Sequence, residues 1–284
     1  MIIEVNIKRS DGATFAIDGT NWRLPEGALD NWGYVENDIT YVENAVGDGD
    51  YYASSRVPST DRTINAIAAS TSNSKTLRKK ALAFFNPKYN FDVYVTYAGV
   101  ERHATGQLYK FECPNVRQSA QVEFNATFMF ANPFLKSVDD FGKDIAQVLG
   151  MVAFPYHCPG YGTKPSGRYN FANEVAISNN GDVETYCKAV IRARGDVVNP
   201  KLIVDDKYVR IIDTMVDGDV YTIDFVNRPA TVKKNGVNAI GNTDRTSDFT
   251  LALSVGSNTI EFDADTGDSL MSVTIYYNEL FLGV

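Results

Sequence analysis

Only a few side chains in this sequence could act as nucleophiles or general bases. The chain has two histidines, His103 and His157, and three cysteines, Cys113, Cys158 and Cys187. A cysteine enzyme needs its thiol and an imidazole within hydrogen-bond reach. His157 and Cys158 are adjacent, and neighbouring strand residues point to opposite faces, so they form a poor pair. Cys187 could meet His157 only through the fold. With no CxxC pair among them, the three cysteines are predicted to be buried structural thiols.

Clustered carboxylates suggest two other chemistries, glycoside hydrolysis and calcium binding. A glycosidase pair could converge from separate loops, and alternate acids in a turn are typical of calcium sites. Acids in the turns of an acidic protein are more often solvated, and no group completes the twelve-residue calcium loop with its final Glu. The acids considered for hydrolysis include Asp205 with Asp206, and Asp213, Asp217 and Asp219; those considered for calcium are Asp217 with Asp219 and Asp263 with Asp265.

Two glycine-rich pairs could suggest a phosphate loop. Gly47-Asp48-Gly49 and Gly160-Tyr161-Gly162 both lack the lysine and the following helix that such a loop requires. The sequence therefore predicts no catalytic, cofactor-binding or metal-ligating residue, no cofactor, and a protein that is not an enzyme.

The N-terminal half alternates apolar and polar residues in the manner of strands. Residues 2–8 and 14–17 flank a turn at Ser10-Asp11-Gly12, which predicts an opening hairpin. The acidic stretch 25–50, rich in turn-forming residues, is predicted to be an exposed arm or long loop. Further strands are expected from Arg62 to Ala68 and across residues 91–130.

One amphipathic helix is expected at residues 74–85. Its apolar stripe has the spacing i, i+4, i+7 and i+8, Asn73 or Ser74 could cap its start, and Asn86-Pro87 would stop it. The run Arg78-Lys79-Lys80 lies away from the stripe and is predicted to be a solvated face. The stripe consists of Leu77, Ala81, Phe84 and Phe85.

Length and strand content favour two domains. A chain of 284 residues exceeds the usual ~150 residues of one domain, and an aromatic content of 12% suits pleated strands. A helix from Val138 to Leu149, ended by Gly150, is predicted to separate them. We therefore expect an N-terminal domain at 1–136, a linker helix at 137–150 and a second domain at 151–284. Short strands with frequent turns predict a β-sandwich after residue 150, and the fold class is all-β with one or two short helices.

The charge distribution limits the possible partners. The net charge of −8 argues against a nucleic-acid binder, which needs a basic surface. Residues 11–61 carry two bases and ten acids (2 − 10 = −8), whereas residues 62–136 carry ten bases and four acids (10 − 4 = +6). These are either solvated faces or surfaces that meet between subunits of a ring. No run approaches the ~20 apolar residues of a membrane span, and Glu4 and Lys8 interrupt any signal peptide, so synthesis in the cytosol is expected.

The second half of the chain has an ordered series of turns and strands. It comprises Asn180-Gly181-Asp182, the strand 188–194, Gly218-Asp219, the strand 221–224, Asn235-Gly236, the strand 249–253, Gly256 to Ile260, and the strand 273–277. This order resembles the galectin-like C-terminal domain of distal tail (Dit) proteins of siphophages. The first half resembles that family more loosely, through Trp22 in the early hairpin, the Arg62 strand, the 77–85 helix and the stop at Asn132-Pro133-Phe134.

This resemblance implies a structural protein of the virion tail tip, in a phage or a phage-derived particle. Its N-terminal domains would form a homo-hexameric ring, a β-sandwich or split-barrel hub of the baseplate. The ring would join the tail tube protein to the tail-associated protein, and the C-terminal domains would hold receptor-binding proteins. Assembly would take place in the host cytoplasm, with no membrane or specific nucleic-acid partner.

Two alternatives remain open, a carbohydrate-binding module and a tail-tube ring component. A sugar site commonly presents an aromatic plane beside polar side chains. Both tryptophans, Trp22 and Trp32, fall in the first half, and the His-x-Asn-x-Arg pattern of galectins cannot be placed here. Because fold does not determine function, at most weak glycan binding is expected of the second half.

Overall fold

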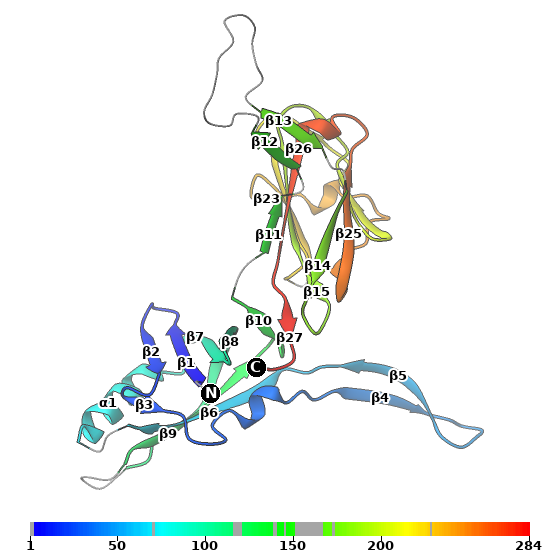
Figure 1. The fold of residues 1–284 in the computed structure, drawn as a ribbon. Helices are drawn as coiled ribbons and strands as arrows, with labels where there is room; N and C mark the ends of the chain where they lie inside the picture. The colour runs from blue at the N-terminus through cyan, green and yellow to red at the C-terminus, as the bar shows by residue number, and fades with distance from the viewer. Residues whose placement is uncertain are drawn as a thin grey trace, which may run out of the picture. The chain divides into compact units, whose positions relative to one another are not determined.

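The computed structural model describes residues 3–69, 72–115, 121–138, 141–144, 146–150, 167–171, 174–227 and 229–284. The chain divides into two compact units (Figure 1). Unit 1 contains Met1–Val138 and Leu280–Val284, and unit 2 contains Asp139–Glu279. The chain therefore passes between the units twice, after residue 138 and after residue 279. The return of the last five residues to unit 1 was not indicated by the sequence.

Unit 1 is built on one antiparallel sheet of nine strands in the order β2-β1-β7-β8-β9-β6-β3, with β10 beside β8 and β27 beside β10. The predicted opening hairpin is confirmed: Val5 of β1 lies opposite Ile17 of β2, and Gly12 takes a φ of +89°, which favours glycine. The strands are β1 (Ile3–Arg9), β2 (Thr14–Ile17), β3 (Trp22–Arg23), β6 (Thr60–Ala68), β7 (Asn90–Tyr97), β8 (Val100–Glu112), β9 (Glu123–Phe130), β10 (Leu135–Ser137) and β27 (Leu280–Phe281).

The core of unit 1 lies on one side of this sheet, where alternate strand residues are buried. Helix α1 (Ser74–Phe84) packs there through Leu77, Ala81 and Phe84, as its apolar stripe predicts. Asn73, one of the two expected capping residues, occupies the N-cap position but makes no side-chain capping bond. In the part of the chain that the structure describes, no helix is long and apolar enough to cross a membrane.

A separate hairpin arises between β3 and β6. After the 3-10 turn η1 (Asp30–Gly33), strands β4 (Asp38–Glu43) and β5 (Asp50–Arg56) pair with each other as a two-stranded ribbon (Figure 1). Gly47-Asp48-Gly49 forms part of the turn that joins them, and Gly49 has a φ of +86°.

Unit 2 is a sandwich of two antiparallel sheets, ordered β11-β26-β16-β21-β22-β23 and β14-β25-β18-β19. Inward side chains of both sheets, such as Ile223 and Phe262, join one core. The strands of the first sheet are β11 (Phe141–Asp144), β16 (Lys188–Ala193), β21 (Val220–Asp224), β22 (Thr231–Lys234), β23 (Val237–Asn238) and β26 (Met271–Tyr277). Those of the second are β14 (Glu174–Asn179), β18 (Lys201–Val204), β19 (Lys207–Arg210) and β25 (Gly256–Asp263).

Short pairs of strands and two 3-10 turns complete unit 2. The pairs are β12 (Ala146–Gly150) with β13 (Gly167–Phe171), β15 (Thr185–Tyr186) with β24 (Ala252–Leu253), and β17 (Val197–Val198) with β20 (Thr214–Met215). The 3-10 turns are η2 (Ile240–Asn242) and η3 (Asp268–Leu270). The all-β fold class with one short α-helix is thus confirmed.

The linker helix predicted at 137–150 is wrong, because this segment forms strands. Phe141 of β11 lies opposite Tyr277 of β26, and Gly150 of β12 lies opposite Gly167 of β13. Pairing with a neighbouring strand satisfies the backbone of this segment, and tertiary context readily overrides a weak helical preference. Asp139 and Asp140, expected in the first turn of that helix, lie outside the described residues.

The Asn-Gly turns have two different outcomes. Asn235 and Gly236 have φ values of +49° and +83° and join β22 to β23, the tight hairpin turn that the sequence predicts. Asn180-Gly181 does not join paired strands, because β14 pairs with β25. The amide of Gly181 instead donates to Asn179 Oδ1 at 3.0 Å, so a side chain shapes this loop.

Candidate interaction surface

The hairpin arm, defined as β4, β5 and their connecting turn, is exposed in unit 1 apart from Asn44 in the turn, which is partly buried. Every residue of both strands is exposed, and among the described residues the two strands pair only with each other. Tyr41 lies opposite Tyr52 with ring centroids 6.4 Å apart, and Val42 lies opposite Tyr51. Since successive strand residues point to opposite faces, both faces of the arm carry apolar side chains. All four of these side chains are more than half exposed.

The arm also carries an excess of acidic side chains. Glu43 lies directly opposite Asp50, and like charges in this position destabilise a hairpin. Residues 38–56 contain four acids and one base (1 − 4 = −3). The single base, Arg56, is 3.4 Å from Asp38. An isolated two-stranded hairpin is marginally stable in water, and clustered exposed apolar side chains mark binding surfaces. The arm therefore has the properties of an element that a partner stabilises.

Helix α1 presents a surface of the opposite charge. Lys75, Lys79 and Lys80 are exposed, and the helix contains no acid. Arg78 is half-buried, and its guanidinium donates to the carbonyls of Cys113 and Pro114 at 3.0 and 3.1 Å. The predicted solvated face thus holds for Lys79 and Lys80, whereas Arg78 ties the helix to the end of β8.

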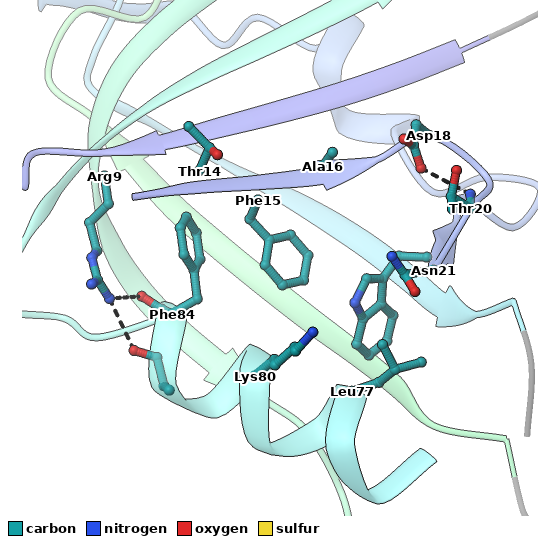
Figure 2. A pocket seen from close by; sticks show the side chains of 12 residues that line it. Arg9, Thr14, Phe15, Ala16, Asp18, Thr20, Asn21, Leu77, Lys80 and Phe84 are labelled. Atoms are coloured by element: carbon teal, nitrogen blue, oxygen red, sulfur yellow. Dashed lines mark hydrogen bonds between the residues drawn. The ribbon is translucent and has the colours of Figure 1, made fainter. Parts of the chain in front are cut away.

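A pocket of about 450 Å³ lies between β2 and α1 (Figure 2). Its floor is apolar, and Lys80 stands at its rim beside Phe15 and Leu77. Arg9 is already occupied: its guanidinium donates to the carbonyls of Ala83 and Phe84 at 3.0 and 2.8 Å and pairs with Asp11 at 2.7 Å. The hydrogen bonds of Arg9 hold the end of α1 against the opening hairpin and so fix the shape of the pocket.

The thiols and histidines do not form a reactive site among the described residues. Cys113 and Cys187 are buried, as expected. Burial raises the pKa of both thiols, that of Cys187 to about 12, which keeps them protonated at neutral pH. His103 stacks on Tyr94 on the outward side of the unit 1 sheet, with ring centroids 5.3 Å apart. His157, Cys158 and Gly160-Tyr161-Gly162 lie outside the described residues.

The two tryptophans lie in a core, and Asp205 and Asp206 lie in a turn between strands. Trp22 and Trp32 are buried in the core of unit 1. Asp205 occupies the β18–β19 turn with a φ of +52°, and its Oδ1 accepts a hydrogen bond from the amide of Thr259 at 2.8 Å. Asp206, beside it, is exposed. These contacts fix loops, and they bring no second carboxylate to Asp205.

Asp213, considered for a glycosidase pair, and Asp219, considered also for calcium, converge on a lysine. The Lys234 ammonium lies 2.8 Å from Asp213 Oδ2 and 3.1 Å from Asp219 Oδ2. The Tyr221 hydroxyl donates to the same oxygen of Asp213 at 2.6 Å. Lys234 therefore supplies the positive charge that a cation would bring. Asp217 is in the same turn, but no described hydrogen bond or ion pair links it to this group.

Asp263 and Asp265, the second pair considered for calcium, bind different partners. The Asp265 carboxylate accepts hydrogen bonds from the Arg210 guanidinium and from the side-chain amide of Asn199, each at 2.7 Å. The Asp263 carboxylate instead accepts a hydrogen bond from the backbone amide of Ala264. Within the described ranges, no three His, Cys, Asp or Glu side chains are grouped so as to hold a metal ion.

Replacing Lys234 by methionine should destabilise unit 2 by about 1–2 kcal/mol at pH 7, since two partly buried carboxylates lose their counter-charge. Burial alone would raise the pKa of Asp213, but hydrogen bonds from Lys234 and Tyr221 outweigh it and the pKa is lowered. Hydrogen bonds from Asn235, from the Val216 amide and from Lys234 lower the pKa of Asp219. The hydrogen bond to Asp213 raises the pKa of Lys234.

The direction of each pKa shift defines the pH range in which the Lys234 ion pairs stabilise unit 2. The carboxylate contribution is present above the ordinary Asp pKa of 3.8 and is lost as pH falls below it. The lysine contribution is present below 10.5 and is lost as pH rises beyond it. Chemical denaturation at pH 7 should therefore separate wild type from Lys234→Met, and the difference should shrink in acid. The exposed neighbour Lys233→Met is the control; an equal loss in both variants would contradict the prediction.

Sequence reasoning missed the strands of the arm and the function of Lys234. The available signal for the arm was Tyr41 between Thr40 and Val42, matched by Tyr51-Tyr52 after the turn. The acids around them favoured a loop. The position of Lys234 between Asp213 and Asp219 depends on strand register, which no local pattern reveals.

Comparison with known proteins gives one family match in unit 2 and a likeness of fold over the whole chain. Residues 180–281 match the family model of the siphovirus-type tail component, C-terminal domain. No curated protein matches the chain. The Dit protein (gp 19.1) of phage SPP1, described as a paradigm of the hub adsorption apparatus in phages infecting Gram-positive hosts, is similar with a TM-score of 0.64 at 13% identity. The similarity covers 98% of this chain and 99% of that one.

A chain of the phage P2 baseplate in its activated conformation with Ca is also similar. Its TM-score is 0.51 at 10% identity, over 98% of each chain. At such identities the likeness is one of fold. The family match confirms the resemblance that was inferred from the turns and strands after Asn180, and it supports a structural role in a phage tail or baseplate. Residues 180–281 are therefore similar to the C-terminal domain of siphovirus-type tail components, and the chain as a whole has the fold of a distal tail protein.

Proposed function

We propose that unit 1 assembles into a six-membered ring at the distal end of the tail. One face of the ring joins the tail tube protein and the other joins the tail-associated protein, while unit 2 holds receptor-binding proteins. The protein acts by assembly, without catalysis, and the ring forms in the host cytoplasm before it becomes part of the tail tip. The fold similarity to a hub protein supports this proposal. The main observation behind it is the exposed hairpin arm.

The arm and α1 have complementary chemistry on a single chain. The arm has a net charge of −3 and exposes Tyr41, Tyr51 and Tyr52. Helix α1 exposes three lysines without an acid, and it lines a pocket with an apolar floor. Opposite charges steer association, and buried aromatic side chains supply most of the binding energy at interfaces.

Each copy carries one arm and one α1 surface, which suits a head-to-tail contact. Such heterologous contacts form closed rings when the rotation between neighbours divides a full turn. We therefore assign the arm of one copy to the α1 surface of the next. This contact also accounts for the opposed charges of residues 11–61 and 62–136.

The combined variant Tyr41→Ser, Tyr51→Ser, Tyr52→Ser should weaken self-association about 10- to 100-fold, since interface tyrosines are frequent hot spots. Sedimentation velocity of the full chain over a range of protein concentrations would measure this. Tyr109→Ser is the matched control, because Tyr109 is 70% exposed in the same unit but lies on β8.

Charge exchange tests the assignment of the two surfaces. Glu43→Lys with Asp50→Lys should abolish rings, and so should Lys79→Glu with Lys80→Glu. When the two double variants are mixed, association should be restored only between a copy of one variant and a copy of the other, because only those contacts join opposite charges. Higher salt should weaken wild-type rings, since exposed charges are screened beyond ~8–10 Å near physiological ionic strength. A strict monomer at every concentration, with the tail partner also present, would refute the ring.

A further inference from the structure

A row of three outward side chains crosses neighbouring strands of the first sheet of unit 2. Lys188 of β16 lies directly opposite Tyr276 of β26 and Asp224 of β21. The next residues, Ala189, Ile223 and Ile275, are buried in the core. Because strand residues alternate, the row Tyr276, Lys188, Asp224 must share the outward face.

This row forms one wall of a pocket of about 280 Å³, which the turn after β21 and Asn278 complete. Tyr276 is 36% exposed, so its ring is available to a ligand. The Lys188 ammonium lies 6.0 Å from the centroid of that ring. Among the residues that the structure describes, no carboxylate pairs with Lys188. An aromatic plane, an ammonium donor and a carboxylate acceptor thus line one small cavity.

Asp224 is held in place before any ligand arrives. Its Oδ1 accepts the amides of Val226 and Asn227 at 2.9 and 3.3 Å, and its Oδ2 accepts Asn227 Nδ2 at 2.8 Å. These bonds fix the orientation of the Asp224 carboxylate. Its two oxygens can still accept further hydrogen bonds from a ligand. Preorganised polar groups beside an aromatic surface are typical of small-ligand sites.

We propose that this pocket binds a single neutral sugar residue. The Tyr276 ring would pack against the C–H face of the pyranose. The Asp224 carboxylate would accept hydrogen bonds from hydroxyl groups, and the Lys188 ammonium would donate to a hydroxyl oxygen. A hydroxylated ring needs donors and acceptors together with an apolar plane, and the row supplies all three. The volume of about 280 Å³ suits one such ring.

The test is a titration of the full chain with glucose, galactose and N-acetylglucosamine at millimolar concentrations, followed by nuclear magnetic resonance of the sugar. At least one sugar should bind. Tyr276→Ala and Asp224→Asn should each weaken binding tenfold or more, and Lys188→Met should weaken it several-fold. Tyr276→Phe should retain binding, because the ring is kept.

The control is Tyr208→Ala, which removes a partly exposed tyrosine from the other sheet of unit 2. Loss of binding in the row variants but not in this control would support the site, provided that the thermal transition of unit 2 is unchanged. No binding of any of the three sugars, or equal binding by Tyr276→Ala and wild type, would overturn it. Ring formation is measured separately and depends on unit 1, so failure of one proposal does not imply failure of the other.

Discussion

Replacing Arg62 by alanine is expected to destabilise unit 1 by about 3–5 kcal/mol. Arg62 is 1% exposed and extends from β6 into the core. Its guanidinium donates to the carbonyl oxygens of Trp32 and Pro133. Within the described residues no carboxylate pairs with it. The arginine therefore acts as a charged cross-link between the η1 turn, the central sheet and the segment before β10.

The size of the effect follows from the groups that alanine would leave behind. Two buried carbonyls would lose their donors, and a cavity would form beside the Trp32 ring, whose centroid is 5.5 Å from the guanidinium carbon. Burial lowers the pKa of Arg62 to about 10, so the side chain is charged in wild type at neutral pH. Arg62→Lys should recover little, because an ammonium cannot present the planar fork that reaches both carbonyls.

Calorimetry of the full chain would resolve this effect, since the unit 1 transition should move and the unit 2 transition should not. Arg23→Ala is the control, because Arg23 is exposed on the edge strand β3, and its replacement should change the stability within about 0.5 kcal/mol. If Arg62→Ala changed stability no more than Arg23→Ala, the cross-link would not support unit 1.

Removing residues 280–284 should likewise destabilise unit 1, by about 3–5 kcal/mol. Leu280 is buried, and β27 pairs with β10. The Arg102 guanidinium donates to the carbonyl of Gly283, and its central carbon lies 3.8 Å from the centroid of the Phe281 ring. The truncated chain would lose this strand pairing and the apolar surface buried with it.

A matched pair of fragments separates this effect from unit 2. Residues 1–138 alone should be less stable than residues 1–138 joined by a short Gly-Ser linker to residues 280–284. A short linker suffices because Lys136 lies opposite Leu280. Residues 139–279 alone should show a cooperative transition, whereas a fragment 151–284 would lack β11 and β12. Equal stability of the two unit 1 fragments would show that the terminal residues contribute nothing.

The sequence predicted the elements whose signals are local. The opening hairpin followed from alternation around Asp11-Gly12, and α1 followed from the stripe Leu77 to Phe85. Arg62 was recognised only as the start of a strand, because its buried donors depend on Trp32 and Pro133, which are distant in the chain. The row of Tyr276, Lys188 and Asp224 joins three strands, and only their register brings those residues together.

The error at residues 137–150 has the same cause. A stretch with Val138, Leu149 and acids at its start fits a short helix when it is considered alone. In the structure the edge of the unit 2 sheet offers β26 to Phe141, and the strand pairing decides the conformation. No tryptophan occurs after residue 32, and the aromatic ring of the proposed sugar pocket belongs to Tyr276.

The return of the chain to unit 1 at Leu280 has an evolutionary consequence. The two strands of unit 1 that flank unit 2 in the sequence, β10 and β27, pair with each other. Two recombination events, one near codon 138 and one near codon 280, would exchange unit 2 as a cassette and leave the complete unit 1 sheet intact. A single event would replace the terminal strand as well and would demand a compatible partner for β10. Proteins with this topology can therefore change unit 2 most readily by paired exchange, while the unit that carries the hairpin arm and α1 is inherited unchanged.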